Sequence, residues 1–461
     1  MKFPPLLILN IVGLDNQLLE RTTYLKRFAQ SGQKCQLIPP LPAVTCTSQA
    51  NLLTGTTPRE HGIVGNGWYF RELAEVFFWR QSNFLVQSPP FWDTFKARFP
   101  QLRVAKLFWW FNMYSSADIS VTPRPAYPAD GRKIPDLYTT PPDLGEELQS
   151  KWGTFPLFHF WGPLANLKSS QWITQAALDI FERFCPHITL VYLPHLDYNL
   201  QRLGPQDPKI SQDVEEIDRL AHQLLPAWQE KDAAIVVLSE YSIFPVQQPI
   251  FLNRILRQEG WLRVQNKKHV GELLDCGASR AFAVCDHQIA HVYVKNPSDI
   301  PPLRQLLEEV EGVEMVLDQE GKRHYHLDHP RSGELVAVAQ TNSWFAYYYW
   351  EKDECAPDFA RTVDIHRKPG YDPVELFFDP QIPFLQLRIL YKLLRKHLGF
   401  RTLMDLIPLD AYLVKGSHGA RPQEGQPYPI FLCNQKLSLP ERIRTQEAHQ
   451  AILQICQNLF R

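Results

Sequence analysis

Residues 41–70 read LPAVTCTSQANLLTGTTPREHGIVGNGWYF and gather Ser and Thr hydroxyls, a His-Gly pair and Asn66 between apolar segments. One interpretation is a polar loop with helix caps, because Ser and Thr are frequent in both. The other is a nucleophile at the start of a helix, since the helical run SQANLLTG follows Thr45 directly. Other parts of the sequence are needed to distinguish these two interpretations.

Short apolar runs alternate with helical patterns through the first half of the chain. Buried strands are predicted within 6–15, 33–40, 102–111, 188–197 and 233–243, and helices within 16–32, 170–185 and 213–229. This alternation predicts an α/β fold in which a mostly parallel sheet is sandwiched by helices.

The pattern changes after Ile250. Strand, helix and strand patterns follow each other over 280–350, and a Pro/Gly-rich return leads to a helical segment at 385–400. We therefore expect a catalytic core formed by 1–255 and 360–461, with 256–359 inserted as a small α+β cap.

The bulk composition narrows the class of protein. The 461 residues carry a net charge of −1, so no general nucleic-acid surface is expected. No apolar stretch is long enough to span a bilayer, and the first apolar run is too short and too interrupted for a signal peptide. The eight cysteines form no CxxC pair. We expect a cytoplasmic protein with reduced thiols and no membrane partner; its oligomeric state stays open.

Carboxylates recur where predicted strands end. Asp15, Asp197 and Glu240 are placed there, and the active sites of such sheets lie at the carboxyl ends of the strands. A carboxylate at this position is more often a helix cap than a ligand. Together with Thr45 and His418, however, the three carboxylates provide oxygen ligands, an imidazole and a nucleophile for metal-assisted phosphoryl transfer.

The order of these motifs resembles the alkaline phosphatase superfamily, in its type I phosphodiesterase/nucleotide pyrophosphatase branch. Residues 41–66 resemble the stretch in which that branch carries its nucleophilic threonine, three residues after a proline. DYNLQRLGP (197–205), SEYSI (239–243) and GSHG (416–419) are similar to three further family motifs. The resemblance implies an alkaline-phosphatase-like fold over nearly the whole chain.

The resemblance also implies roles for individual residues. Thr45 would be the nucleophile, and Asn66 would donate to a phosphoryl oxygen. The implied metal ligands are Asp15, Thr45, Asp197, Glu240 and His418. Two divalent ions are expected, zinc in the family.

Two imidazoles of the family pattern are replaced in this chain. Gln201 and Tyr241 stand where histidines are expected, which leaves a donor set rich in oxygen. Such a set favours Mn²⁺, Mg²⁺ or Fe over Zn²⁺, if both residues bind metal; alternatively, one metal position is lost.

The return segment TVDIHRKPGYDP (362–373) offers replacements. Asp364 and His366 are candidate ligands, and Lys368 is a candidate phosphate-binding residue. The competing interpretation is a structural turn around Pro369 and Gly370 with a solvated basic pair.

The sequence predicts a metal-dependent hydrolase of phosphoric diester, pyrophosphate or phosphonate bonds that acts through a phospho-threonine. A phosphotransferase or mutase of the same superfamily is one alternative. A non-catalytic binding protein that kept the fold is the other, and Gln201 and Tyr241 favour it.

Overall fold

The computed structural model describes residues 3–129, 132–364 and 368–460. Its core is a nine-stranded sheet of order β21-β2-β20-β9-β1-β8-β5-β6-β7. The pairs β1–β8, β1–β9, β5–β8, β5–β6 and β2–β21 are parallel, and those made by β20 and by β7 are antiparallel. The predicted α/β fold with a mostly parallel sheet is therefore confirmed.

The strands of this sheet follow the apolar runs of the sequence. The central strand β1 (Leu6–Ile11) is buried at every residue, as expected for a strand that is covered on both faces. The other strands are β2 (Gln33–Ile38), β5 (Val104–Leu107), β6 (Ile119–Pro123), β7 (Leu137–Thr140), β8 (Ile188–Leu193), β9 (Ala234–Leu238), β20 (Ile430–Cys433) and β21 (Arg442–Arg444).

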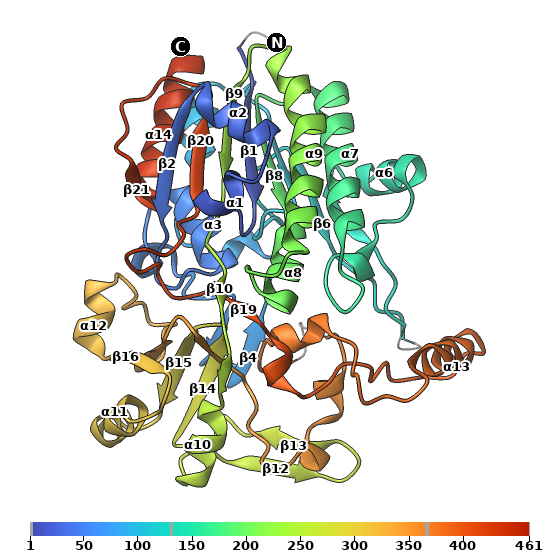
Figure 1. Cartoon of the computed structure of the whole chain (residues 1–461), viewed down its shortest axis with the longest axis vertical. Coiled ribbons are helices and arrows are strands. Elements are labelled where there is room, and N and C mark those ends of the chain that lie inside the picture. The colour runs from blue at the N-terminus through green and yellow to red at the C-terminus, as the bar shows by residue number, and fades with distance from the viewer. Residues whose placement is uncertain (1–2, 130–131, 365–367, 461) are drawn as a thin grey trace.

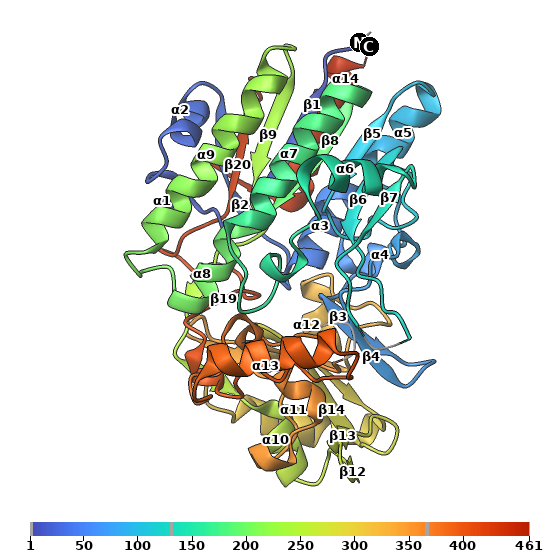
Figure 2. The same ribbon diagram turned by 90° about the vertical axis from the view of Figure 1, so that its right-hand side faces the viewer.

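Helices cover the two faces of the sheet (Figures 1 and 2). One row packs in the order α2 (Tyr24–Gln30), α9 (Ile210–Gln229), α7 (Leu167–Phe184) and α6 (Leu144–Trp152), and α8 (His195–Leu203) packs against α9. The opposite face holds α3 (Thr45–Thr54), α14 (Thr445–Leu459) and α5 (Phe91–Arg98). The predicted helix at 16–32 is interrupted, because α1 (Asn16–Leu19) ends before α2 begins.

A second layer lies below the carboxyl ends of the strands (Figure 1). Its main sheet has the order β14-β15-β17-β16, and all its pairs are antiparallel. These strands are β14 (Ala281–Asp286), β15 (Ile289–Val294), β16 (Val313–Leu317) and β17 (Leu335–Ala339), accompanied by α10 (Leu252–Gln258), α11 (Ile300–Glu308) and α12 (Gln319–His324). These elements lie within residues 252–339, and the insert bounds 256–359 stay a prediction.

Shorter elements connect the layers. They are α4 (Pro58–His61), α13 (Leu385–His397), and the paired strands β3 (Gly67–Phe70) with β4 (Glu75–Phe78), β10 (Phe244–Pro245) with β19 (Gly416–Ser417), β11 (Gln248–Ile250) with β18 (Ser343–Phe345), and β12 (Val264–Lys267) with β13 (Gly271–Leu274).

Two hydrophobic clusters fill the molecule, one within the nine-stranded layer and one within the lower layer. All eight cysteines are free. None of the helices in the described part of the chain is both long and apolar enough to cross a bilayer.

Candidate active site

Thr45 is the first residue of α3, at the end of the nine-stranded layer that faces the lower layer. Val44 before it is extended, and Gly55 ends the helix in the left-handed conformation at φ 69°. The helix therefore presents the Thr45 side chain together with its N-terminal backbone amides, which carry a partial positive charge. This is the placement that the opening stretch predicts.

The Thr45 hydroxyl belongs to a short chain of hydrogen bonds. Its Oγ1 lies 3.1 Å from the Tyr241 hydroxyl, which lies 3.3 Å from Asp197 Oδ1 and donates to it. Because a phenol has one proton, Tyr241 must accept from Thr45. The three side chains are buried and form a path from the hydroxyl to a carboxylate.

Burial sets the protonation states of Asp197 and Tyr241 at neutral pH. It raises the pKa of Asp197 to about 7 and holds the pKa of the Tyr241 phenol well above its usual range. Gln201 Nε2 donates to the second oxygen of Asp197 at 2.8 Å. At neutral pH, Asp197 is thus poised between its protonated and ionised forms, and Tyr241 is neutral.

His418 lies beside the path. Its ring stacks on that of Tyr241 with centroids 3.7 Å apart, and Nδ1 lies 2.9 Å from the Ala43 carbonyl oxygen. Because a carbonyl only accepts, Nδ1 carries the proton and Nε2 has a free lone pair. Burial lowers the pKa of His418 to about 3, so the imidazole is neutral.

The lower layer contributes a second histidine. His287 lies in the β14–β15 turn with φ 58° and places its ring 3.8 Å from that of His418. Burial lowers the pKa of His287 well below its usual value. The sequence analysis missed His287, because nothing in AVCDHQIA marks a residue of the insert that reaches the core.

A cavity of about 110 Å³ opens onto these groups and has a largely aromatic wall. It is lined by Thr45, Trp79, Gln81, Trp110, Pro123, Pro125, Lys133, Leu157, Phe158, Phe160, Trp161, Tyr192, Pro194, Asp197, Tyr198, Tyr241, His287, Val363, Tyr371 and His418. Lys133 is the only cation among these residues. Val363 and Tyr371 bring the return segment to the cavity, whereas His366 lies outside the described residues and Asp364 is not part of the lining.

Several expected site residues have other partners. Asp15 caps α1, accepting from the amides of Gln17 and Leu18 at 2.9 and 2.8 Å, and burial raises its pKa to about 6. Lys368 is buried in an ion pair with Glu375 at 2.6 Å. Neither Asp15 nor Lys368 lines the cavity.

Glu240 and Asn66 are buried and hydrogen-bond within the protein, and Glu240 also interacts with the Thr45 side chain. Glu240 Oε1 accepts from Asn10 Nδ2 and Gln49 Nε2, both at 2.5 Å, and burial raises its pKa to about 8. The Asn66 amide accepts from the Cys46 backbone at 2.9 Å and donates to Asp286 at 3.0 Å. Asn66 thereby fastens the first turn of α3 to β14.

The donor set does not fit the two ions that the resemblance implies. Both oxygens of Asp197 accept hydrogen bonds, whereas Asp15 caps its helix through Oδ1 alone. Glu240 accepts from two amides through Oε1 alone, and its Oε2 has no hydrogen-bond partner. Within the described ranges, no three acidic, imidazole or thiol ligand atoms drawn from the expected set lie within 4.8 Å of one another. The chemistry of the site is therefore derived without a metal-bound step.

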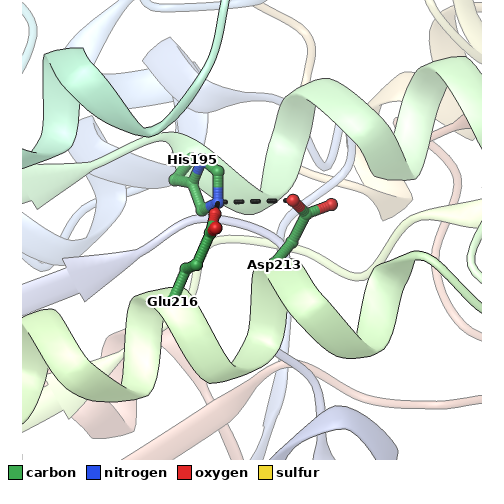
Figure 3. Close-up of side chains that lie close together, drawn as sticks. All are labelled: His195, Asp213 and Glu216. Carbon is green, nitrogen blue, oxygen red and sulfur yellow. Dashed lines mark ion pairs between the residues drawn. The ribbon is translucent and has the colours of Figure 1, made fainter.

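One acid–histidine group does meet that criterion, at a different place. His195 Nε2 lies 3.0 Å from Glu216 and 3.5 Å from Asp213, both on α9 (Figure 3). His195, Asn199 and Arg202 share a face of α8 that lines another cavity, away from Asp197. The group links α8 to α9 outside the Thr45 cavity.

Four buried carboxyls make the stability depend on pH. Burial raises the pKa of Asp197, Asp286 and Asp372 to about 7 and that of Glu240 to about 8, so the folded state holds protons that the unfolded chain has lost. Buried histidines, whose pKa is lowered, act in the opposite direction mainly below their unfolded pKa of about 6.5. Burial also lowers the pKa of Lys106 to about 7, which opposes the decline in this range, but it is one group against four. We expect the free energy of unfolding to fall between about pH 6.5 and 8, by up to about 1.4 kcal/mol per pH unit for each carboxyl that stays protonated.

Urea unfolding followed by tryptophan fluorescence over this range measures the decline. Glu240→Gln keeps a neutral side chain of the same shape and should flatten the upper part of the curve. An exposed control, Glu259→Gln, should leave the curve unchanged. A wild-type stability that rises between pH 6.5 and 8 would contradict the assignment of protonated carboxyls.

The fold and site together define an α/β protein of the alkaline phosphatase type, with a threonine at a helix N-terminus below the sheet. The model of the family "Type I phosphodiesterase / nucleotide pyrophosphatase" matches residues 6–372, and this chain belongs to that family. The family is one of typically metal-dependent hydrolases that act on small phosphorylated substrates.

Similar proteins are distant. An uncharacterized pyrophosphatase/phosphodiesterase of Schizosaccharomyces pombe is 24% identical over 220 residues, which are 45% of this chain and 38% of that protein. The chain thus matches well under half the length of this curated relative.

Among solved structures, phosphonoacetate hydrolase from Sinorhizobium meliloti 1021 in complex with phosphonoformate superposes with a TM-score of 0.62 at 16% identity. The match covers 98% of this chain and 95% of the other. Murine ectonucleotide pyrophosphatase / phosphodiesterase 5, in an inactive threonine-to-alanine variant with AMP, gives 0.60 at 13% identity, covering 98% and 95%. At these identities the likeness shows the fold alone.

Proposed function

We propose that this chain hydrolyses phosphoric diester, pyrophosphate or phosphonate bonds, with Thr45 as the nucleophile. The observation that carries the proposal is the hydrogen-bonded path from Thr45 through Tyr241 to Asp197, which opens onto the aromatic cavity. The inactive threonine variant of the murine relative, which holds AMP, supports the choice of residue and of a nucleotide-like substrate.

In the proposed first step, the Thr45 oxygen bonds to phosphorus as the bond from phosphorus to the leaving group breaks. The Thr45 proton passes to Tyr241, and the Tyr241 proton passes to ionised Asp197. The proton on Asp197 passes to the leaving group, which departs as the first product. Water then attacks the phosphorus of the phospho-threonine, the bond from phosphorus to Thr45 Oγ1 breaks, and a proton of the water restores the Thr45 hydroxyl. The α3 N-terminus and Lys133 supply positive charge for the phosphoryl oxygens.

The aromatic wall restricts the substrate. Trp79, Trp110, Trp161 and Tyr371 line the cavity, and Lys133 is the only cation among the lining residues. Such a wall favours an ester that carries an aromatic or apolar group, since a base or aryl ring can stack there. Inorganic phosphate and small polar monoesters would make fewer contacts.

A binding protein without turnover is the second candidate. The favouring observation is that internal hydrogen bonds occupy both oxygens of Asp197, one carboxylate oxygen each of Asp15 and Glu240, and the side-chain amide of Asn66. Such a protein would bind a phosphate ester in the cavity and release it unchanged. The two candidates differ in a single measurable property, turnover.

A substrate panel with metal control tests the proposal. Purified protein, before and after exhaustive chelation, is assayed with aryl phosphodiesters, nucleotide pyrophosphates, phosphonates and monoesters. We expect turnover of an aromatic diester or nucleotide pyrophosphate that survives chelation, because the path needs no ion. Loss on chelation with recovery by Mn²⁺, Mg²⁺, Fe²⁺ or Zn²⁺ would restore the two-ion prediction. Binding without turnover under every condition would favour the second candidate.

A further inference from the structure

Exposed apolar surface is concentrated in one segment. Among the described residues, seventeen large hydrophobic side chains are exposed, and nine of them lie between Phe384 and Leu403. Isolated exposed hydrophobic residues are normal on a soluble protein, but contiguous apolar patches mark interaction sites. This segment is therefore a candidate interaction surface.

The segment is built around α13, which has no buried residue. Leu387, Leu390, Tyr391, Leu394 and Leu398 recur at spacings of one helical face, with exposed fractions of 54–65%. Figures 1 and 2 show α13 at the edge of the molecule, with its length running along the outside of the lower layer. The apolar face points to solvent, the reverse of an ordinary surface helix.

The other residues of α13 are basic. Residues 385–397 contain Arg388, Lys392, Arg395, Lys396 and His397, and no Asp or Glu. Arg388 and Lys392 both pair with the single carboxylate of Asp405. Arg395 lies over the rings of Tyr391 and Phe400 at 5.7 and 5.6 Å, so its charge borders the apolar face. The segment keeps a net positive charge.

We propose that α13 lies in the surface of an anionic lipid bilayer. Leu387, Leu390 and Leu394 enter the boundary of the acyl chains, while the basic residues beside them meet anionic headgroups. Phe384 and Phe400 flank the helix as exposed residues, and Phe is a side chain found on the apolar faces of helices that lie in a membrane surface. The association is peripheral and departs from the expectation that the protein has no membrane partner.

Charge favours a lipid surface over a second copy of the chain. Two copies that packed through α13 would bring two sets of basic residues together around an apolar seam, and like charges repel. An anionic bilayer complements those residues and accepts a convex row of leucines without requiring a matching groove. The test below therefore also measures self-association of the protein.

Vesicle flotation with the full-length protein tests the proposal. We expect the protein to float with vesicles of phosphatidylcholine and phosphatidylglycerol, to float much less with pure phosphatidylcholine, and to be released as salt screens the charges. The variant Leu387→Ser/Leu390→Ser/Leu394→Ser should lower the bound fraction at least tenfold. A matched control, Leu73→Ser/Leu164→Ser, removes similarly exposed leucines elsewhere and should float like the wild type.

Circular dichroism and light scattering accompany the flotation. If the triple variant unfolds at the same temperature as the wild type, its loss of vesicle binding is due to the altered surface and not to misfolding. The proposal is overturned if the wild type stays at the bottom of the gradient with anionic vesicles, or if the triple variant floats equally well. A dimer that the triple variant dissociates, without vesicle binding by the wild type, would assign α13 to self-association instead.

Discussion

Replacement of Thr45 by alanine should lower turnover by about a thousandfold or more, because it removes the atom that forms the covalent bond to phosphorus. The fold should survive, since the backbone of α3 begins equally well with alanine, and the substitution removes only the polar contacts of the Thr45 side chain with Tyr241, Tyr192 and Glu240. The measurement is kcat/KM with the best substrate of the panel, together with thermal unfolding. Mass spectrometry of quenched wild-type enzyme should detect a phosphoryl adduct on Thr45.

Cys46→Ala is the matched control for this experiment. The Cys46 thiol is buried one residue further along the same helix, and burial raises its pKa well above the usual value, which makes it a poor nucleophile. Its removal should leave turnover within a few-fold of the wild type. Near-normal rates of the Thr45 variant with every active substrate would show that the nucleophile is elsewhere.

The fold could be predicted because its signals are local. Each apolar run contains its strand, as in β1 within 6–15 and β9 within 233–243. The helix that begins at Thr45 is predicted by the helical run SQANLLTG. The change of pattern after Ile250 likewise separates the lower layer from the core. Burial of both faces of a central parallel strand leaves a run of apolar residues that few other structures produce.

The site was less predictable, because its hydrogen bonds join distant segments. Glu240 is held by Asn10 and Gln49, and Asn66 is held by Asp286, more than two hundred residues away. No sequence pattern specifies such partners, so the sequence marks Glu240 and Asn66 as site residues without revealing which way they face. Asp15 shows the same ambiguity, since a carboxylate after a strand caps the next helix as readily as it binds a ligand.

The replaced residues Gln201 and Tyr241 are the most informative of these differences. In the structure both contact Asp197, one at each carboxylate oxygen, and the Tyr241 ring stacks on His418. The Tyr241 hydroxyl thus joins Thr45 to one oxygen of Asp197, and Gln201 donates to the other.

Asp197→Asn should lower turnover by about a hundredfold to ten-thousandfold, since it removes the proposed proton acceptor. The pH dependence separates this role from a structural one. Because burial raises the pKa of Asp197 to about 7 and only its ionised form accepts a proton, the wild-type rate should rise with pH and level off above about 7. In Asp197→Asn the residual rate should no longer rise with pH near 7.

Tyr241→Phe tests the same path at its middle. It deletes the hydroxyl that joins Thr45 to Asp197 but keeps the ring that stacks on His418, so packing is preserved. We expect a loss of about a hundredfold or more in kcat with a smaller change in KM, because the hydroxyl acts on the nucleophile rather than on substrate binding. A variant that retains both the wild-type rate and the step near pH 7 would disconnect Tyr241 and Asp197 from the activation of Thr45. The double variant Asp197→Asn/Tyr241→Phe tests whether the two residues act together. If they serve one path, its turnover should be little lower than that of the slower single variant.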